Sequence, residues 1–185
     1  MRMPAILSRL FGARDETAHE LYGALVAQAR RPAFYADLGV PDTPAGRYDM
    51  IVLHAFLLFE RLGGGAEERA LGQRVFDIMF VDLDRSLREM GIGDLSVPKR
   101  IKVMARAFYG HVAAYGEACK AGSTEMMREA IARNIYPDRA GQPEGAAALA
   151  AYAFAARARL AAQPFAEIKA GRLAFPQPSN VEAAS

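Results

Sequence analysis

The chain is poor in the residues that form disulfides, ligate metals or span membranes. Its 185 residues include one cysteine, Cys119, and three histidines. A single cysteine excludes an intrachain disulfide, which is typical of a reducing compartment. The longest apolar run, Met50 to Phe59, is well short of the ~20 residues of a membrane-spanning helix and is typical of a buried helix. We therefore expect a cytoplasmic protein.

The first residues do not have the pattern of a secretory signal. Ser8 and Arg9 interrupt their apolar run, and no cleavage site of small residues follows. Residues 1–14 instead predict a short amphipathic segment. Such a segment either lies on a membrane surface, here the cytoplasmic face of the inner membrane, or packs on the rest of the protein.

Neither sign of charge dominates the composition. The 23 basic and 21 acidic residues give a net charge of +2, so the whole chain has no general attraction for nucleic acid. A basic partner surface must therefore be local. The content of 52% hydrophobic and 24% charged residues is typical of a globular protein, and the length fits one domain of about 100–200 residues.

Apolar residues at helical spacing run through most of the chain, and strand patterns are almost absent. We expect helices near residues 15–30, 44–62, 66–90, 96–121, 123–136 and 146–163, with a short one after Pro164. Asp15, Thr43, Ser96 and Ser123 are predicted to begin helices as caps, and Gly91 and Gly122 are predicted helix ends. The sequence predicts an all-α, single-domain helical bundle of six or seven helices over residues 15–175, with a loose tail at 176–185.

No arrangement of residues suits catalysis or metal binding. His19, His54, His111 and Cys119 lack the spacing of metal ligands. His54, inside an apolar helix, predicts a hydrogen-bonded core histidine, and Cys119, on an apolar stripe, predicts a buried thiol. Gly63–Gly65 lacks the lysine and hydroxyl residue of a phosphate-binding loop. We expect no catalytic residue, metal or cofactor, and so no enzyme.

Charged residues gather around the turn between the helices at 66–90 and 96–121. Asp82 and Arg85, and Asp84 and Arg88, have the spacing of intrahelical ion pairs. Flanking arginines favour ionised carboxylates, whereas acid–base catalysis needs one that is desolvated. These residues therefore indicate a surface and not an active site.

The second of these helices begins with the basic residues Lys99, Arg100, Lys102 and Arg106. Positive charge in a first turn opposes the helix dipole, which is a small cost in stability. The cluster is either an ordinary solvated face or a surface for an anionic partner: an acidic protein, lipid headgroups or RNA. An all-α ligand-sensing or nucleic-acid-associated regulator that uses this Lys99–Arg106 face is the alternative function.

Two stretches carry a resemblance to a known family. "FDIMFVDLDRSLREMGIGDLSVPKRIKVMARAFYGHVAAY" (76–115) and "QARRPAFYADLGVPDTPAGRYDMIVLHAFLL" (28–58) resemble the ubiquinol–cytochrome c chaperone family, in its compact bacterial form. The resemblance implies a non-catalytic assembly factor that binds newly made cytochrome b, or another component of complex III, and assists assembly of ubiquinol–cytochrome c reductase. It also implies work near the ribosome. We expect no specific DNA partner.

The resemblance places the partner-binding surface on the charged helix–turn–helix. It maps onto Asp82, Asp84, Arg85, Arg88, Gly91, Gly93, Asp94, Lys99, Arg100 and Lys102, to which we add Arg106, Phe108 and Tyr109 on the same helix. His111 stands where the family would be expected to carry arginine after "FYG".

Holding an apolar client also requires an exposed apolar groove. The candidates for this groove are Phe34, Tyr35 and Val40 in a predicted proline-rich loop at residues 32–44, or Phe108 and Tyr109. For each of them the alternative is packing in the core.

Overall fold

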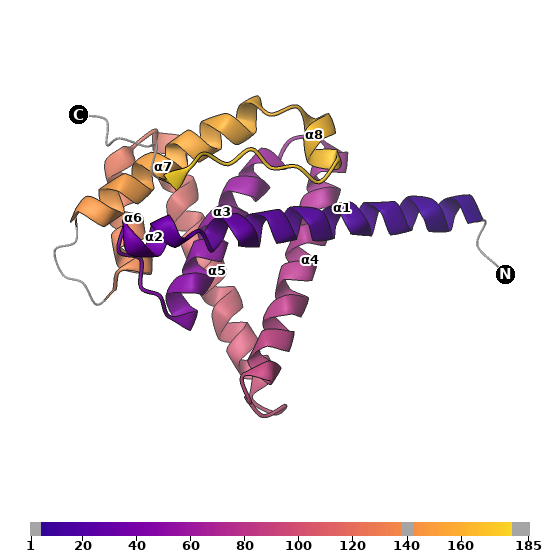
Figure 1. The fold of residues 1–185 in the computed structure, drawn as a ribbon, viewed down its shortest axis with the longest axis horizontal. Coiled ribbons are helices and arrows are strands. Elements are labelled where there is room, and N and C mark those ends of the chain that lie inside the picture. The colour runs from indigo at the N-terminus through magenta and orange to yellow at the C-terminus, as the bar shows by residue number, and fades with distance from the viewer. Residues whose placement is uncertain (1–4, 138–142, 179–185) are drawn as a thin grey trace.

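Six long helices and two five-residue helices make up the described part of the chain, residues 5–137 and 143–178, in a computed structural model. They are α1 (Ala5–Ala29), α2 (Pro32–Ala36), α3 (Pro44–Arg61), α4 (Ala66–Glu89), α5 (Val97–Ala121), α6 (Thr124–Ile135), α7 (Pro143–Ala162) and α8 (Phe165–Lys169). No strand occurs in these residues. The predicted all-α bundle is confirmed (Figure 1).

The first helix differs from the prediction in its length. A separate segment at residues 1–14 and a helix from about residue 15 were expected, but α1 is continuous from Ala5 to Ala29 and runs through Gly12. An interior glycine costs only ~1 kcal/mol, which a long helix can absorb. The N-terminal part of α1 extends beyond the bundle (Figure 1). The side chains of residues 1–15, and with them the choice between membrane contact and packing, lie outside what the structure describes.

Two predicted caps are confirmed by their hydrogen bonds, whereas the prediction for Ser96 is wrong, because its backbone is already helical and its side chain forms no capping hydrogen bond. The Thr43 hydroxyl accepts from the Gly46 N–H at 3.1 Å, and the Ser123 hydroxyl accepts from the Met126 N–H at 3.2 Å. Each satisfies a backbone donor that the first helical turn leaves unpaired. Gly122 ends α5 in the left-handed conformation, with φ of 60°, which glycine adopts without strain.

α3 is the central helix of the bundle. It packs against α1, α4, α5, α6 and α7, and every residue from Met50 to Leu58 is buried. A helix that is apolar on all faces gains stability only by being enclosed in this way. The other long helices therefore take their positions from contact with α3 or with one another around it.

The one histidine of α3 lies in a buried hydrogen-bond network. His54 Nδ1 lies 2.7 Å from the Met50 carbonyl and Nε2 lies 2.9 Å from the Tyr152 hydroxyl, so Nδ1–H donates and Nε2 accepts. Gln28 Nε2 donates to the Tyr152 hydroxyl and to the Pro176 carbonyl, both at 2.9 Å. The prediction of a hydrogen-bonded core histidine is confirmed.

The network also holds the segment that follows α8. Pro176 and Pro178 are buried against the bundle, although the sequence predicts a loose tail from residue 176. The Pro176 carbonyl has a buried partner in Gln28, and this hydrogen bond orders the chain at that point. Residues 179–185 lie outside the described part of the chain.

Arg61 fixes the turn from α3 to α4. Its guanidinium pairs with Glu68 at 2.7 Å and donates to the carbonyls of Leu160 and Gln163 at 3.0 and 3.1 Å. Glu68 also accepts from the Gly65 N–H at 2.7 Å, which caps α4. The start of α4 is thereby tied to the end of α7.

We predict that Tyr152→Phe lowers the free energy of unfolding by about 1–3 kcal/mol, because it leaves buried His54 Nε2 without its donor. Urea denaturation measures the change. Tyr109→Phe is the matched control, since the Tyr109 side chain is 60% exposed and its loss of a hydroxyl should change stability little. Equal effects of the two variants would contradict the structural role of the network.

Candidate functional site

The predicted partner-binding residues lie on one projecting hairpin. α4 and α5 run from the bundle to a shared turn, residues 90–96, that stands away from the other helices (Figure 1). Gly91 has φ of 79°, in the left-handed region, and its N–H donates to the Arg88 carbonyl at 2.9 Å. Gly93 has no such conformation, so only Gly91 is required by the backbone of the turn.

The acidic residues and arginines of α4 pair with one another. Arg88 pairs with Asp84 at 2.7 Å and with Asp94 across the turn, and Arg85 pairs with Asp82. The predicted intrahelical pairs are therefore confirmed. Asp82 also accepts a hydrogen bond from the Tyr22 hydroxyl at 2.9 Å, which attaches α4 to α1. Much of this charge is accordingly used within the protein.

The four basic residues in the first half of α5 have a different environment. Lys99, Arg100, Lys102 and Arg106 are exposed, and none forms an ion pair with another described residue. Lys99, Lys102 and Arg106 follow the i, i+3, i+7 spacing of one helical face. That face is opposite the buried stripe that contains Phe108 and Tyr115. These cations are available to a partner.

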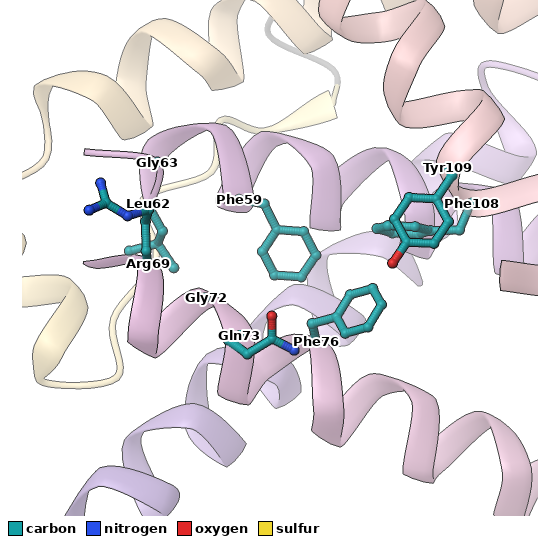
Figure 2. Close-up of a pocket in the computed structure, with 9 residues that line it drawn as sticks. All are labelled: Phe59, Leu62, Gly63, Arg69, Gly72, Gln73, Phe76, Phe108 and Tyr109. Atoms are coloured by element: carbon teal, nitrogen blue, oxygen red, sulfur yellow. The ribbon is translucent and has the colours of Figure 1, made fainter. Parts of the chain in front are cut away.

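At the base of the hairpin, aromatic rings surround an open groove of about 340 Å³. Figure 2 shows Phe59 of α3, Phe76 of α4 and Phe108 of α5 pointing toward one another, with Tyr109 beside Phe108. The ring centroids of Phe76 and Phe108 are 5.5 Å apart, as are those of Phe108 and Tyr109. Both pairs are edge-to-face, an arrangement that aromatic rings prefer. We call this the aromatic groove.

The edge of the aromatic groove is polar and partly formed by glycine. Arg69, Gln73 and the exposed Gly63 complete its lining with Leu62 and Gly72. Gly72 is buried, and a Cβ placed there would meet Leu62 at 3.5 Å, an ordinary contact. The groove thus combines an apolar floor with hydrogen-bonding groups at its margin, as ligand-binding sites do.

The groove candidates from the sequence have different outcomes. Phe34 and Val40 are core residues, with 0% and 3% of their surface exposed, so their assignment to a groove is wrong. Tyr35 is half-buried and donates to the Ala29 carbonyl at 2.9 Å. Phe108 is 3% exposed and forms part of the groove wall, whereas Tyr109 is 60% exposed. Tyr109 alone among the five is largely free to contact a client.

The tertiary structure divides the predicted surface into two parts. Tyr109 lies fourteen residues beyond Leu95, which is about 20 Å along a helix. The charged turn and the aromatic groove therefore occupy opposite ends of the hairpin. Sequence reasoning treated Phe59 and Phe76 only as helical core positions and did not find Gln73. Their spacing carries no signal for the groove, because the groove forms only where α3, α4 and α5 meet.

His111, the residue that departs from the expected arginine, faces an acidic side chain. Its Nδ1 lies 3.7 Å from Asp49 Oδ1, which is beyond hydrogen-bonding distance. Burial raises the pKa of Asp49 to about 7 and lowers the pKa of His111, so burial favours the neutral form of each. We therefore describe the pair as a close polar contact and not as an ion pair.

Other candidate chemistry is limited in the described residues. No group of three histidine, cysteine, aspartate or glutamate side chains gathers there in a way that could hold a metal ion. Cys119 is buried, as predicted, and burial raises the pKa of its thiol to about 11. None of the helices within 5–137 and 143–178 combines the length and hydropathy of a membrane span.

Comparison with known proteins identifies the family. The family model of the ubiquinol-cytochrome C chaperone matches residues 36–175, which include the hairpin and the aromatic groove. The chain belongs to this family. A crystal structure of the Cbp3 homolog from Brucella abortus is similar with a TM-score of 0.87 and 40% sequence identity, over 96% of this chain and 98% of that one. The search of curated proteins finds no match. The family resemblance of the sequence is confirmed.

We predict that truncation of the two adjacent aromatic residues of α5 changes the stability of the protein by very different amounts. Phe108→Ala should lower the free energy of unfolding by about 3–5 kcal/mol, because it empties a buried ring position. Tyr109→Ala should change it by less than about 1 kcal/mol, because that side chain is exposed. Urea denaturation of the two variants tests this, and a large loss for Tyr109→Ala would show that it belongs to the core.

We predict that Asp49→Asn stabilises the protein above neutral pH. Burial raises the pKa of Asp49 from 3.8 to about 7, so the wild type loses stability as the pH rises through that interval and the buried carboxyl ionises. Asparagine cannot ionise. The free energy of unfolding of the variant should exceed that of the wild type by about 2–4 kcal/mol at pH 8, and by much less at pH 5. Thermal denaturation across this range measures the difference. Destabilisation at pH 7–8 would instead indicate an ion pair with His111.

Proposed function

We propose that the protein is a non-catalytic assembly factor that binds newly made cytochrome b through the aromatic groove and assists its incorporation into ubiquinol–cytochrome c reductase. Family membership supports the general role in assembly of this complex. The single observation that supports the groove as the client site is its partly exposed aromatic lining, with Tyr109 60% exposed beside the half-buried Phe76 and the buried Phe108.

The client requires protection that an aromatic groove can supply. The helices of a membrane cytochrome are apolar, and before insertion or assembly they expose that surface to water. A volume of about 340 Å³ accommodates one or two large apolar side chains, and not an entire helix. The groove would therefore hold a helix by anchor residues placed one turn apart, in the manner of other grooves that bind helices.

The polar margin gives the client a preferred orientation. Gln73 and Arg69 lie at the edge of the groove, and the Tyr109 hydroxyl adds a further donor and acceptor. Gln73 Nε2 donates to Asp77 at 2.8 Å, which leaves its carbonyl oxygen for a partner. Such groups fix the position of an apolar ligand while its side chains supply most of the binding energy. A shallow site of this kind also allows the client to be released.

Recovery of the client from a respiring bacterial host tests this proposal. Tagged wild type should co-purify with cytochrome b, and Tyr109→Asp should reduce the recovery at least tenfold, because a carboxylate at the groove wall opposes burial of apolar side chains. Met126→Asp is the matched control, since Met126 is also an exposed apolar residue but lies on α6. All variants are first compared by thermal denaturation.

A second variant separates the two ends of the hairpin. Arg88→Glu/Lys102→Glu reverses charge at the turn and leaves the aromatic groove unchanged. Loss of cytochrome b with this variant but not with Tyr109→Asp would move the client site to the charged turn. Recovery of no respiratory protein by the wild type would contradict the proposed function.

A further inference from the structure

Apolar side chains are exposed at the end of the hairpin that is remote from the aromatic groove. Leu95 is 98% exposed, Val103 59% and Met90 57%. Leu95 lies in the turn itself, Met90 ends α4, and Val103 lies on the second turn of α5. Aliphatic side chains at a projecting tip gain nothing from the core of their own protein. Their joint exposure indicates a surface that contacts a membrane or another molecule.

Basic residues surround these apolar side chains. Residues 84–106 carry six basic and three acidic side chains, and two of the acidic ones, Asp84 and Asp94, pair with Arg88. Lys99, Arg100, Lys102 and Arg106 have no such partner among the described residues, and the dipole of the helix opposes positive charge in its first turns. An external anionic surface would remove this electrostatic cost.

Basic and aliphatic side chains lie together on one face of α5. Lys99, Val103 and Arg106 follow each other at i, i+4 and i+7, so an aliphatic group lies between two cations. Beside them is a depression of about 450 Å³. Its lining residues are Leu87, Ser96, Lys99, Arg100, Val103 and Met104. The depression has an apolar floor and two cations at its edge, which fits an acyl chain beneath a phosphate.

We propose that the tip of the α4–α5 hairpin docks on an anionic lipid bilayer. Leu95, Met90 and Val103 enter the boundary between headgroups and acyl chains, and the basic residues of α5 contact lipid phosphates. Long basic side chains reach the headgroup layer while their aliphatic stems remain in apolar surroundings. This surface is distinct from the client groove and does not depend on it.

The composition of the tip favours a bilayer over RNA. Single-stranded RNA is held by stacking of its bases on aromatic rings, and residues 90–106 contain no aromatic residue, the next along α5 being the buried Phe108 and the exposed Tyr109. Exposed leucine, methionine and valine add nothing to phosphate contacts with RNA. A bilayer interface is stabilised by both the aliphatic and the basic side chains.

Docking in this way brings the client groove to the membrane. The aromatic groove lies at the other end of the same hairpin, within about 20 Å of the tip. A chaperone attached by its tip would hold the apolar client close to the bilayer that receives it.

Flotation with vesicles tests the proposal. Vesicles of phosphatidylcholine with one quarter phosphatidylglycerol should bind the wild type, and vesicles of phosphatidylcholine alone should not. Lys99→Gln/Lys102→Gln should weaken binding about twenty-five-fold, because each basic residue near an anionic surface contributes a factor of about five. Arg159→Gln/Arg172→Gln makes the same change in charge at exposed residues on α7 and after α8, and should bind like the wild type.

A second pair of variants tests insertion without any change in charge. Leu95→Ser/Val103→Ser should weaken binding to the anionic vesicles at least fivefold, and Met126→Ser should not. Failure of the wild type to bind these vesicles, or equal binding by tip and control variants, would overturn the proposal. Salt-sensitive binding of single-stranded RNA by the wild type, with no vesicle binding, would assign the tip to nucleic acid instead.

The absence of tryptophan allows a direct measurement of depth. The chain contains none, so Leu95→Trp introduces one fluorescent reporter at the tip. Its emission should shift to shorter wavelength with anionic vesicles and be quenched by brominated acyl chains. Met126→Trp, on α6, should show neither effect. An unshifted Leu95→Trp emission at saturating vesicle concentration would exclude insertion of the tip. Loss of cytochrome b binding by Tyr109→Asp is independent of these results, so the two proposals can fail separately.

Discussion

The burial of α3 is the constraint on which the structure depends. Its middle turns are enclosed by five other helices, and its single polar side chain there, His54, must find partners in a region without water. Tyr152 and the Met50 carbonyl provide them, and Gln28 extends the network to the segment after α8. Since a half-satisfied network would be costly, these hydrogen bonds select one arrangement of α1, α3 and α7.

The packing of α4 and α5 against this core determines which part of their hairpin forms a groove and which part projects. Near α3 its aromatic residues are held by Phe59 and by the Arg61–Glu68 pair, so they form a wall with a fixed shape. Farther out, Tyr22 of α1 still holds α4 and Tyr48 of α3 still holds α5, whereas the turn between α4 and α5 projects into solvent (Figure 1). One element thus carries an apolar groove at its base and a basic, aliphatic tip.

Much of the local structure could be predicted from sequence because it depends on neighbours a few residues apart. Helical periodicity located most helices, Thr43 and Ser123 capped as expected, and Arg85 and Arg88 paired with acidic residues one turn away. The continuity of α1 was missed because a glycine is a weak helix breaker whose effect depends on context. Phe34 was assigned to a loop groove because proline and glycine indicated a surface, although its ring packs against His54 and Tyr152.

The sequence by itself determined the fold class, the family and the basic cluster at the start of α5, because these follow from composition, periodicity and a run of residues read in order. Only the tertiary structure decided that Phe108 is a wall and Tyr109 an exposed surface, and that His111 faces Asp49. It alone divided the predicted surface into a groove and a tip. The partners in each case lie on different helices, and their distance in space is set by packing around α3, which local spacing does not encode.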